Sequence, residues 1–232
     1  MRILAVVAHP DDADIFCGGT LAKHADQGDD VTIAHLTAGE YGGFETTEDE
    51  IAATRKAEAT RSAETLGCEC TFLGFKDGRL ENTIENRLEI VDTIREYEPD
   101  LLITHYEDDM HPDHRVTATL VTDAYYMASL PMVETDHEPH DPDNVYFFGK
   151  PTADFEPDVY IDITGYLEQK TDAIEHHESQ VVFLQEHGGI DDEYDNLLES
   201  VRAKAQVLGT KSGVTAAEGY RRHHTIAAEG LR

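Results

Sequence analysis

Two short clusters of histidine and aspartate contain the side chains in this sequence that could do metal chemistry. The first is Ala8-His9-Pro10-Asp11-Asp12, and the second, far along the chain, is His111-Pro112-Asp113-His114. Each cluster holds imidazole and carboxylate groups within a few residues. Such groups ligate a catalytic zinc ion and supply the general base that works beside it. The residue types therefore indicate a hydrolytic metal site.

An apolar stretch that predicts a buried strand precedes each cluster. Residues 2–8 lead into the first cluster and residues 100–104 lead into the second. In an open parallel sheet, ligands bind beyond the carboxyl ends of the strands. Two polar clusters at two such strand ends therefore predict one shared site.

Short apolar runs alternate with amphipathic helical patterns up to about residue 130, which is typical of βαβ units around a parallel sheet buried on both faces. We expect a single α/β domain over residues 1–232, Rossmann-like, with a mostly parallel sheet and helices on both faces. The pattern predicts strands at 2–8, 31–36, 71–73, 100–104 and 159–163, helices at 18–28, 48–66, 83–97, 113–128, 165–178 and 195–207, and loops at 134–143 and 188–194.

Acidic residues dominate the charge of the chain, with 48 Asp and Glu against 18 Lys and Arg and a formal net charge of −30. Such a surface repels nucleic acid and anionic membranes, because both are bound through basic groups. Disorder is not indicated, because hydrophobic residues make up 40% of the chain and recur in periodic blocks. We interpret the charge as that of a protein from a halophilic host, where salt screens the repulsion. An ordinary acidic protein is the alternative.

Three features of the sequence predict a cytoplasmic protein. No apolar run reaches the roughly 18 residues that a membrane span needs. The start Met1-Arg2-Ile3 runs directly into a predicted strand, which leaves no room for a signal peptide. The cysteines, Cys17, Cys68 and Cys70, are odd in number and lack a metal-type spacing, which favours a reducing compartment.

Three side chains suit the role of metal ligands. His9 and Asp12 lie on a predicted strand-to-helix turn, where both can face one ion, and His114 lies at the start of a predicted helix. Three protein ligands leave a fourth position open for water, which distinguishes a catalytic zinc site from a structural one.

The remaining polar residues of the clusters suit catalytic roles beside that ion. Asp11 is placed to take a proton from the attacking water. His111 could stabilise the developing oxyanion or protonate the leaving group, and Asp113 could orient an imidazole through its other ring nitrogen. Alternatively, each cluster is a polar turn built from turn residues and helix caps. Two such clusters at matching strand ends favour the functional interpretation.

Other polar or small residues are predicted to be structural. The pairs His176-His177 and His223-His224 are adjacent in sequence and splay apart on a helix, so we expect them on the solvated surface. His35 is expected to be a hydrogen-bonded core histidine and Cys17 a packing residue. Gly18-Gly19-Thr20 lacks the dinucleotide-binding pattern and is expected to allow close packing.

The motifs of the chain, taken together, resemble those of the PIG-L/LmbE-like zinc-dependent N-deacetylases, which act on N-acetylglucosamine-containing compounds. The first family motif corresponds to Ala8–Asp12 with Asp14 and Gly18–Thr20, and the second corresponds to His111–His114. Further blocks that resemble the family are residues 36–40, 55–58, 73–80 and 157–163.

The resemblance implies roles for individual residues. It implies that His9, Asp12 and His114 ligate one Zn²⁺ per chain, with other divalent metals as alternatives. It implies that Asp11 is the base and His111 the electrophilic or acid partner. It further implies that Arg55 holds the substrate and that Asp77 contacts sugar hydroxyls. It also implies a small-molecule N-acetylated sugar as substrate and a homo-oligomer, a trimer or a hexamer.

The expected activity is hydrolytic removal of the acetyl group from an N-acetylglucosamine-containing small molecule or glycoconjugate. One alternative is a non-catalytic metal- or sugar-binding protein, and another is a metallo-amidase that acts on a different acyl amide. A phosphoesterase is disfavoured, because phosphoryl transfer usually needs two metals or several basic groups.

Overall fold

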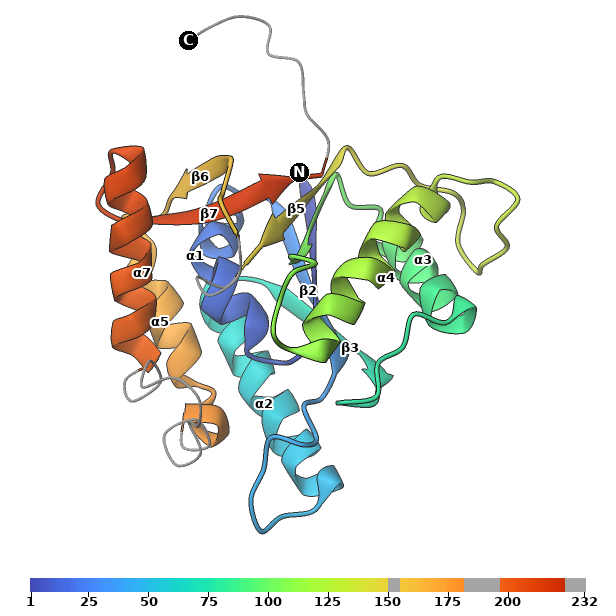
Figure 1. Ribbon diagram of the computed structural model, residues 1–232, viewed down its shortest axis with the longest axis horizontal. Coiled ribbons are helices and arrows are strands. Elements are labelled where there is room, and N and C mark those ends of the chain that lie inside the picture. Colours follow the sequence, from blue (N-terminus) through green and yellow to red (C-terminus); the bar gives the residue numbers. More distant parts are fainter. Residues whose placement is uncertain (150–154, 182–196, 224–232) are drawn as a thin grey trace, which may run out of the picture.

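The computed structural model of the protein describes residues 1–149, 155–181 and 197–223 and is built around one seven-stranded sheet (Figure 1). The strand order is β3-β2-β1-β4-β5-β7-β6. Strands β1 to β5 run parallel to one another, whereas β7 is antiparallel to both of its neighbours. The strands are β1 (Arg2–Val7), β2 (Asp30–Thr37), β3 (Glu69–Phe75), β4 (Leu101–His105), β5 (Asn144–Phe148), β6 (Val159–Asp162) and β7 (Ala217–Arg222).

Helices cover both faces of this sheet. In Figure 1, α3 and α4 lie on one face, and α1, α2, α5 and α7 lie on the other. The helices are α1 (Asp12–Asp26), α2 (Glu48–Leu66), α3 (Ile84–Tyr97), α4 (Pro112–Ala128), α5 (Leu167–Glu175) and α7 (Leu197–Ser212). None of the described helices is long and apolar enough to cross a membrane.

The central strand β1 supplies side chains to both cores in alternation. Ile3, Ala5 and Val7 pack with α1 and α2, whereas Leu4 and Val6 pack with α3 and α4. Because successive side chains of a strand point to opposite faces, a strand covered on both sides must be apolar at every position. This requirement explains the uninterrupted apolar run that precedes the first cluster.

The strand order places a switch of direction between β1 and β4. The chain proceeds from β1 outward through β2 and β3, and from β4 outward through β5. The two strands are parallel neighbours, with Val6 paired to Thr104, so their carboxyl ends meet at one edge. A crevice outside the strand ends at such a switch point is where α/β sheets bind ligands. The two clusters follow these two strands.

The predicted fold class is confirmed, with corrections at the level of elements. Helix α1 begins at Asp12 rather than at residue 18, because acidic residues in its first turn suit the helix N-terminus and the glycines of the helix are packed against neighbours. Strands β5 and β7 were not predicted; β7, with the sequence Ala-Glu-Gly-Tyr-Arg-Arg, carries little apolar alternation. The predicted loop at 188–194 and the predicted start of a helix at 195 lie outside the described residues.

Candidate metal centre

The three ligands expected from the sequence meet at the edge where β1 and β4 end. Nδ1 of His9 lies 3.2 Å from Oδ2 of Asp12 and 3.3 Å from Nε2 of His114. The same nitrogen of His114 lies 3.1 Å from Oδ1 of Asp12. Two atoms bound tetrahedrally to zinc at its usual bond lengths lie about 3.3 Å apart. The two imidazole nitrogens therefore have this spacing from each other and from one oxygen each of Asp12, His9 from Oδ2 and His114 from Oδ1.

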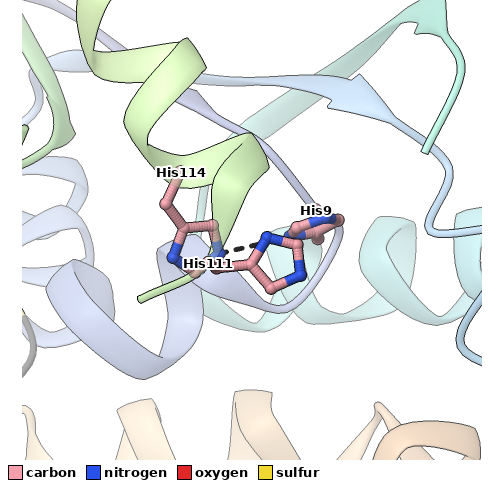
Figure 2. Close-up of side chains that lie close together, drawn as sticks. All are labelled: His9, His111 and His114. Atoms are coloured by element: carbon pink, nitrogen blue, oxygen red, sulfur yellow. Dashed lines mark hydrogen bonds between the residues drawn. The ribbon is translucent and has the colours of Figure 1, made fainter. Parts of the chain in front are cut away.

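The start of α4 brings the second cluster to this point. His111 is the N-cap of the helix, Pro112 occupies the first turn and His114 follows inside it. Proline suits that position because its missing N–H has no partner there in any case. Figure 2 shows the rings of His9, His111 and His114 gathered at this helix start. The local helix geometry thus turns His114 toward the end of β1.

His9, Asp12 and His114 form a triangle of ligand side chains. Two further carboxylates face His9 on the side of its ring opposite this triangle. Oδ1 of Asp77 lies 3.3 Å and Oδ2 of Asp113 lies 3.5 Å from its Nε2. Asp77 also accepts a hydrogen bond from the backbone N–H of Tyr41, and Asp113 accepts one from that of Gly78. A carboxylate at the far nitrogen fixes the ring orientation of a ligating histidine. Asp113 thus lies where the sequence suggested, whereas Asp77 contacts His9 and is buried.

Two residues that the sequence reasoning missed complete the surroundings of the triangle. Oδ2 of Asp109 lies 3.1 Å from Nδ1 of His114, on the side away from Asp12. His105, the last residue of β4, is buried 3.4 Å from Asp12. Its Nε2 accepts a hydrogen bond from the N–H of Ala8, so that lone pair is occupied. The strand-end position of His105 and the acidic run before His111 were the available signals.

The electrostatics of the centre favour positive charge. Burial by itself lowers the pKa of His9, yet Asp12, Asp113 and Asp77 raise it well above its ordinary value. Burial likewise lowers the pKa of His114, but Asp12 and Asp109 outweigh this effect and raise it above its ordinary value. The pKa of Asp12 is held well below its ordinary value, against the effect of burial, by His114, His105 and His9. A buried site that favours cations and presents nitrogen and carboxylate donors fits a divalent metal.

Within the described residues, the donor atoms of three overlapping sets of side chains lie within 4.8 Å of one another. In two of these sets one donor atom already accepts a backbone hydrogen bond, since Nε2 of His105 accepts the N–H of Ala8 and Oδ2 of Asp113 accepts that of Gly78. Oδ2 of Asp12 likewise accepts the N–H of His9 at 2.7 Å, whereas its Oδ1 faces Nε2 of His114. The sets are His9, His111 and His114; Asp12, His105 and His114; and His9, Asp77 and Asp113.

Asp11 lies beside the triangle and is held by Arg55. Nη2 of Arg55 donates to Oδ1 of Asp11 at 2.7 Å, and Nη1 donates to the carbonyl of Gly39 at 3.0 Å. The Arg55 side chain is only 4% exposed and that of Asp11 is 14% exposed. Arg55 therefore contacts the expected base, whereas the sequence resemblance implied a contact with substrate.

His111 lies over the centre as a neutral imidazole. Burial, followed by the nearby His9 and His114, lowers its pKa to about 4. Its Nδ1 accepts the backbone N–H of Asp113 at 3.3 Å. The proton of the neutral ring is then on Nε2, which leaves that atom as a hydrogen-bond donor.

The prediction that His177 lies on the solvated surface is wrong. His177 is 1% exposed, and its Nε2 lies 2.7 Å from Oδ2 of Asp14, whose other oxygen accepts a hydrogen bond from Ser62. Helix α5 ends at Glu175 and His176 is its C-cap, so His177 lies beyond the helix on which the prediction placed it. His223 is exposed as predicted, His176 is half-buried with its Nε2 2.9 Å from Oγ1 of Thr65, and His224 lies outside the described residues. His35 is buried and bonded to the carbonyl of His9, as expected.

The glycines of α1 pack closely, as the sequence suggested. A side chain at Gly19 would lie 2.7 Å from Ile163, which follows β6. The backbone N–H groups of Gly19 and Thr20 also donate to the carboxylate of Glu218. That carboxylate is buried with Lys170, 2.5 Å away. Cys17 is fully buried nearby, and burial raises the pKa of its thiol well above the ordinary value.

Comparison with known proteins places the chain in a family. The model of the family described as "PIG-L: GlcNAc-PI de-N-acetylase" matches residues 4–125, which include both clusters. This chain belongs to the PIG-L family. Among PIG-L relatives, the diacetylchitobiose deacetylase of Thermococcus kodakarensis is 34% identical over 233 residues, covering 95% of this chain and 82% of the relative.

Solved structures agree with this family assignment. The N,N'-diacetylchitobiose deacetylase of Pyrococcus horikoshii superposes with a TM-score of 0.83 at 28% identity, covering 95% of this chain and 83% of that one. Another relative has a different activity, the 4-oxalmesaconate hydratase of Pseudomonas putida, which is 27% identical over 250 residues, covering 99% of this chain and 87% of the relative. The proteins to which this chain is similar therefore include a hydratase as well as deacetylases.

Proposed function

We propose that this protein is a zinc-dependent N-deacetylase that hydrolyses the acetamide of an N-acetylglucosamine-containing small molecule or glycoconjugate. The observation that carries the proposal is the donor triangle of His9, Asp12 and His114 with the carboxylate of Asp11 beside it. The deacetylases among the relatives give the acyl group and the class of sugar.

His9, through Nδ1, Asp12 and His114, through Nε2, would hold the metal. When bound, a zinc ion there supplies Lewis acidity for the acetamide carbonyl and lowers the pKa of water to about 7. Asp77, Asp113 and Asp109 fix the two imidazoles from behind. The ligands are therefore oriented by the protein before a metal arrives.

Asp11 would accept the proton of the attacking water. Arg55 binds its Oδ1, which leaves Oδ2 for the proton, because no hydrogen bond to Oδ2 occurs within the part of the chain that the structure describes. The same carboxyl group then returns the proton to the departing nitrogen, and acetate and a free amine are released. A binding protein would not need such a base.

His111 would donate through Nε2 to the oxygen of the acetamide as negative charge develops on it. Because its pKa is lowered to about 4, the ring is neutral near pH 7 and acts as a hydrogen-bond donor. A donor fixed at the start of a helix needs little reorganisation during the reaction, which is the usual source of oxyanion stabilisation.

The charges around the centre favour a neutral sugar over a polycarboxylic acid such as 4-oxalmesaconate, for which the hydratase relative is named. Carboxylates surround the triangle, and Arg55, the buried arginine beside it, is already paired with Asp11. A substrate with several carboxylates would need unpaired basic groups there. The hydratase relative nevertheless makes an unsaturated tricarboxylic acid, 4-oxalmesaconate, a necessary member of any substrate panel.

The test is amine release from a panel of N-acetylglucosaminyl compounds, measured in molar salt with zinc-loaded protein. We expect release from at least one compound, its loss after chelation and its return on addition of zinc. The acid substrate of the panel is followed by the loss of its double-bond absorbance. Turnover of that acid, with no amine released, would replace the deacetylase by a hydratase. If metal-loaded protein turns over none of these compounds, the result would favour a non-catalytic binding protein.

A further inference from the structure

One face of α2 carries three buried polar side chains that each bind a different part of the site. Arg55 binds Asp11, Glu58 binds Ser179 and Ser62 binds Asp14. Spacings of three and four residues place all three on one helix face. A buried polar face is costly unless every group finds a partner, so these contacts fix what lies against α2.

The segment that follows α5, residues 177–180, supplies much of that partner surface. The backbone N–H and the hydroxyl of Ser179 both donate to the carboxylate of Glu58, at 2.9 Å and 2.6 Å. Nε2 of Gln180 donates to the carbonyl of Gly42 at 2.8 Å, and the residue is 5% exposed. The segment is therefore joined both to α2 and to the loop that follows β2.

That loop encloses the guanidinium of Arg55. Gly39 has a positive φ of 67°, and a Cβ on it would lie 2.0 Å from Nη1 of Arg55. A Cβ on Gly42 would lie 2.6 Å from the same nitrogen and 2.8 Å from Oε1 of Gln180. The backbone of Gly42 thus lies between the two side chains. The carbonyl of Gly39 completes the enclosure by accepting a hydrogen bond from Arg55.

We propose that Gln180 is a positioning residue for the proton-accepting carboxylate, acting through Gly42 and Arg55 on Asp11. The proposal rests on the function proposed above, in which Asp11 takes the proton. Gln180 holds the carbonyl of Gly42, the loop between Gly39 and Gly42 confines the guanidinium, and the guanidinium fixes Oδ1 of Asp11. Small displacements of a reacting group can cost up to about 10²-fold in rate.

Gln180→Ala and Gln180→Glu test this chain of contacts. Glutamate keeps the size of the side chain but removes the donor that Gly42 needs. We expect both variants to lose on the order of 10-fold in kcat, with KM nearly unchanged and zinc content unchanged, because substrate binding does not involve the lost contact. Normal kcat in Gln180→Glu would overturn the proposal.

Gln169 offers a matched control. It lies on α5, and its amide also donates to a backbone carbonyl, that of Thr65, at 2.8 Å. Thr65 lies at the far end of α2 from Arg55. Gln169→Ala removes the same kind of bond and should leave kcat unaltered. An equal loss of kcat in both alanine variants would show a general loosening rather than positioning.

Coupling to Arg55 is the decisive readout. If Gln180 acts through Arg55, Gln180→Ala should cost little further kcat when Arg55 is already alanine; independent effects would multiply instead. A crystal structure of the Gln180→Ala variant tests, without any substrate, whether Gln180 positions Arg55 relative to Asp11. We expect the distance from Nη2 of Arg55 to Oδ1 of Asp11 to lengthen from 2.7 Å. An unchanged distance would overturn the inference even if the protein proved not to be a deacetylase.

Discussion

Asp109 and His114 meet at 3.1 Å through the ring nitrogen that faces away from Asp12. Asp109 is 7% exposed, and its other oxygen accepts the backbone N–H of His111. One carboxylate thus holds both the N-cap of α4 and the histidine one turn into that helix. The acidic residue before the second cluster is therefore part of the scaffold of the centre.

We expect Asp109→Asn to weaken zinc binding by about 10–100-fold, the usual effect of losing a carboxylate behind a ligating imidazole. The neighbouring Asp108 is exposed, so Asp108→Asn changes the same charge without touching His114. Zinc affinity measured by competition with a chelating dye compares the two. Equal affinities in both variants would mean that Asp109 does not support a metal ligand.

Asp11→Asn should separate proton transfer from metal binding. We expect kcat to fall by about 10²–10⁴-fold, because a general base contributes that much, while zinc content stays near one per chain. His9→Ala should lose both activity and metal. Metal analysis and amine release on the same samples check both results. Substantial turnover by Asp11→Asn would assign the base to another group.

The position of the centre could be predicted from sequence, whereas the contacts that support it could not. His9 and His114 follow strands that are recognisable as apolar runs, and parallel sheet topology brings the ends of such strands together. Asp77 and Asp109 bind through contacts that depend on the final packing. The pairing of His177 with Asp14 likewise depends on where the chain turns after α5, which no local pattern reveals.

Strand β7, which lies between β5 and β6, was also harder to predict than the central strand β1. Strand β1 is buried on both faces and reads as a continuous apolar run, whereas β7, with the sequence Ala-Glu-Gly-Tyr-Arg-Arg, does not. A glutamate, Glu218, occupies a buried position of this strand because it binds partners in α1 and α5, which are distant in sequence. A tertiary ion pair thus masks the strand pattern.

Glu218→Gln should destabilise the protein by about 3–5 kcal/mol, because it leaves the buried ammonium of Lys170 without its counter-charge. Glu168 provides the control, since it pairs with Arg202 but its side chain is 77% exposed. We expect Glu168→Gln to cost less than about 1 kcal/mol. Urea unfolding near pH 7 compares the two variants with the parent protein.

The stabilisation by Glu218 should also depend on pH in a defined direction. Burial would raise the pKa of this carboxyl, but Lys170 and the hydrogen bonds from Thr20 hold it below the ordinary value of 4.5. Its contribution is therefore complete above pH 4.5 and is lost as the pH falls through the lower, folded-state pKa. The difference in unfolding free energy between parent and Glu218→Gln should shrink in that acid range. If this difference in unfolding free energy stayed constant as the pH falls, Glu218 and Lys170 would not form an ionised pair.

Salt should stabilise this protein more than it stabilises a chain of balanced charge. At a net charge of −30 the surface carboxylates repel one another, and raising ionic strength from 0.1 M to 1 M shortens the screening length from about 10 Å to about 3 Å. We expect the unfolding temperature to rise over this range in potassium chloride. Sucrose at matched osmolality is the control, because it does not screen charge. An unfolding temperature indifferent to potassium chloride would count against the halophilic interpretation.

The carboxylate of Glu218 accepts the N–H groups of two residues in α1 that precede it by 199 and 198 positions. During synthesis, the first helix and the strand that carries His9 leave the ribosome long before this partner exists. Contacts across such a separation form late, after the entropy of closing the chain has been overcome. A nascent chain truncated before β7 would leave these amides and Lys170 without Glu218. The edge of the sheet that carries the candidate metal centre would then gain its final rigidity only after Glu218 has been synthesised.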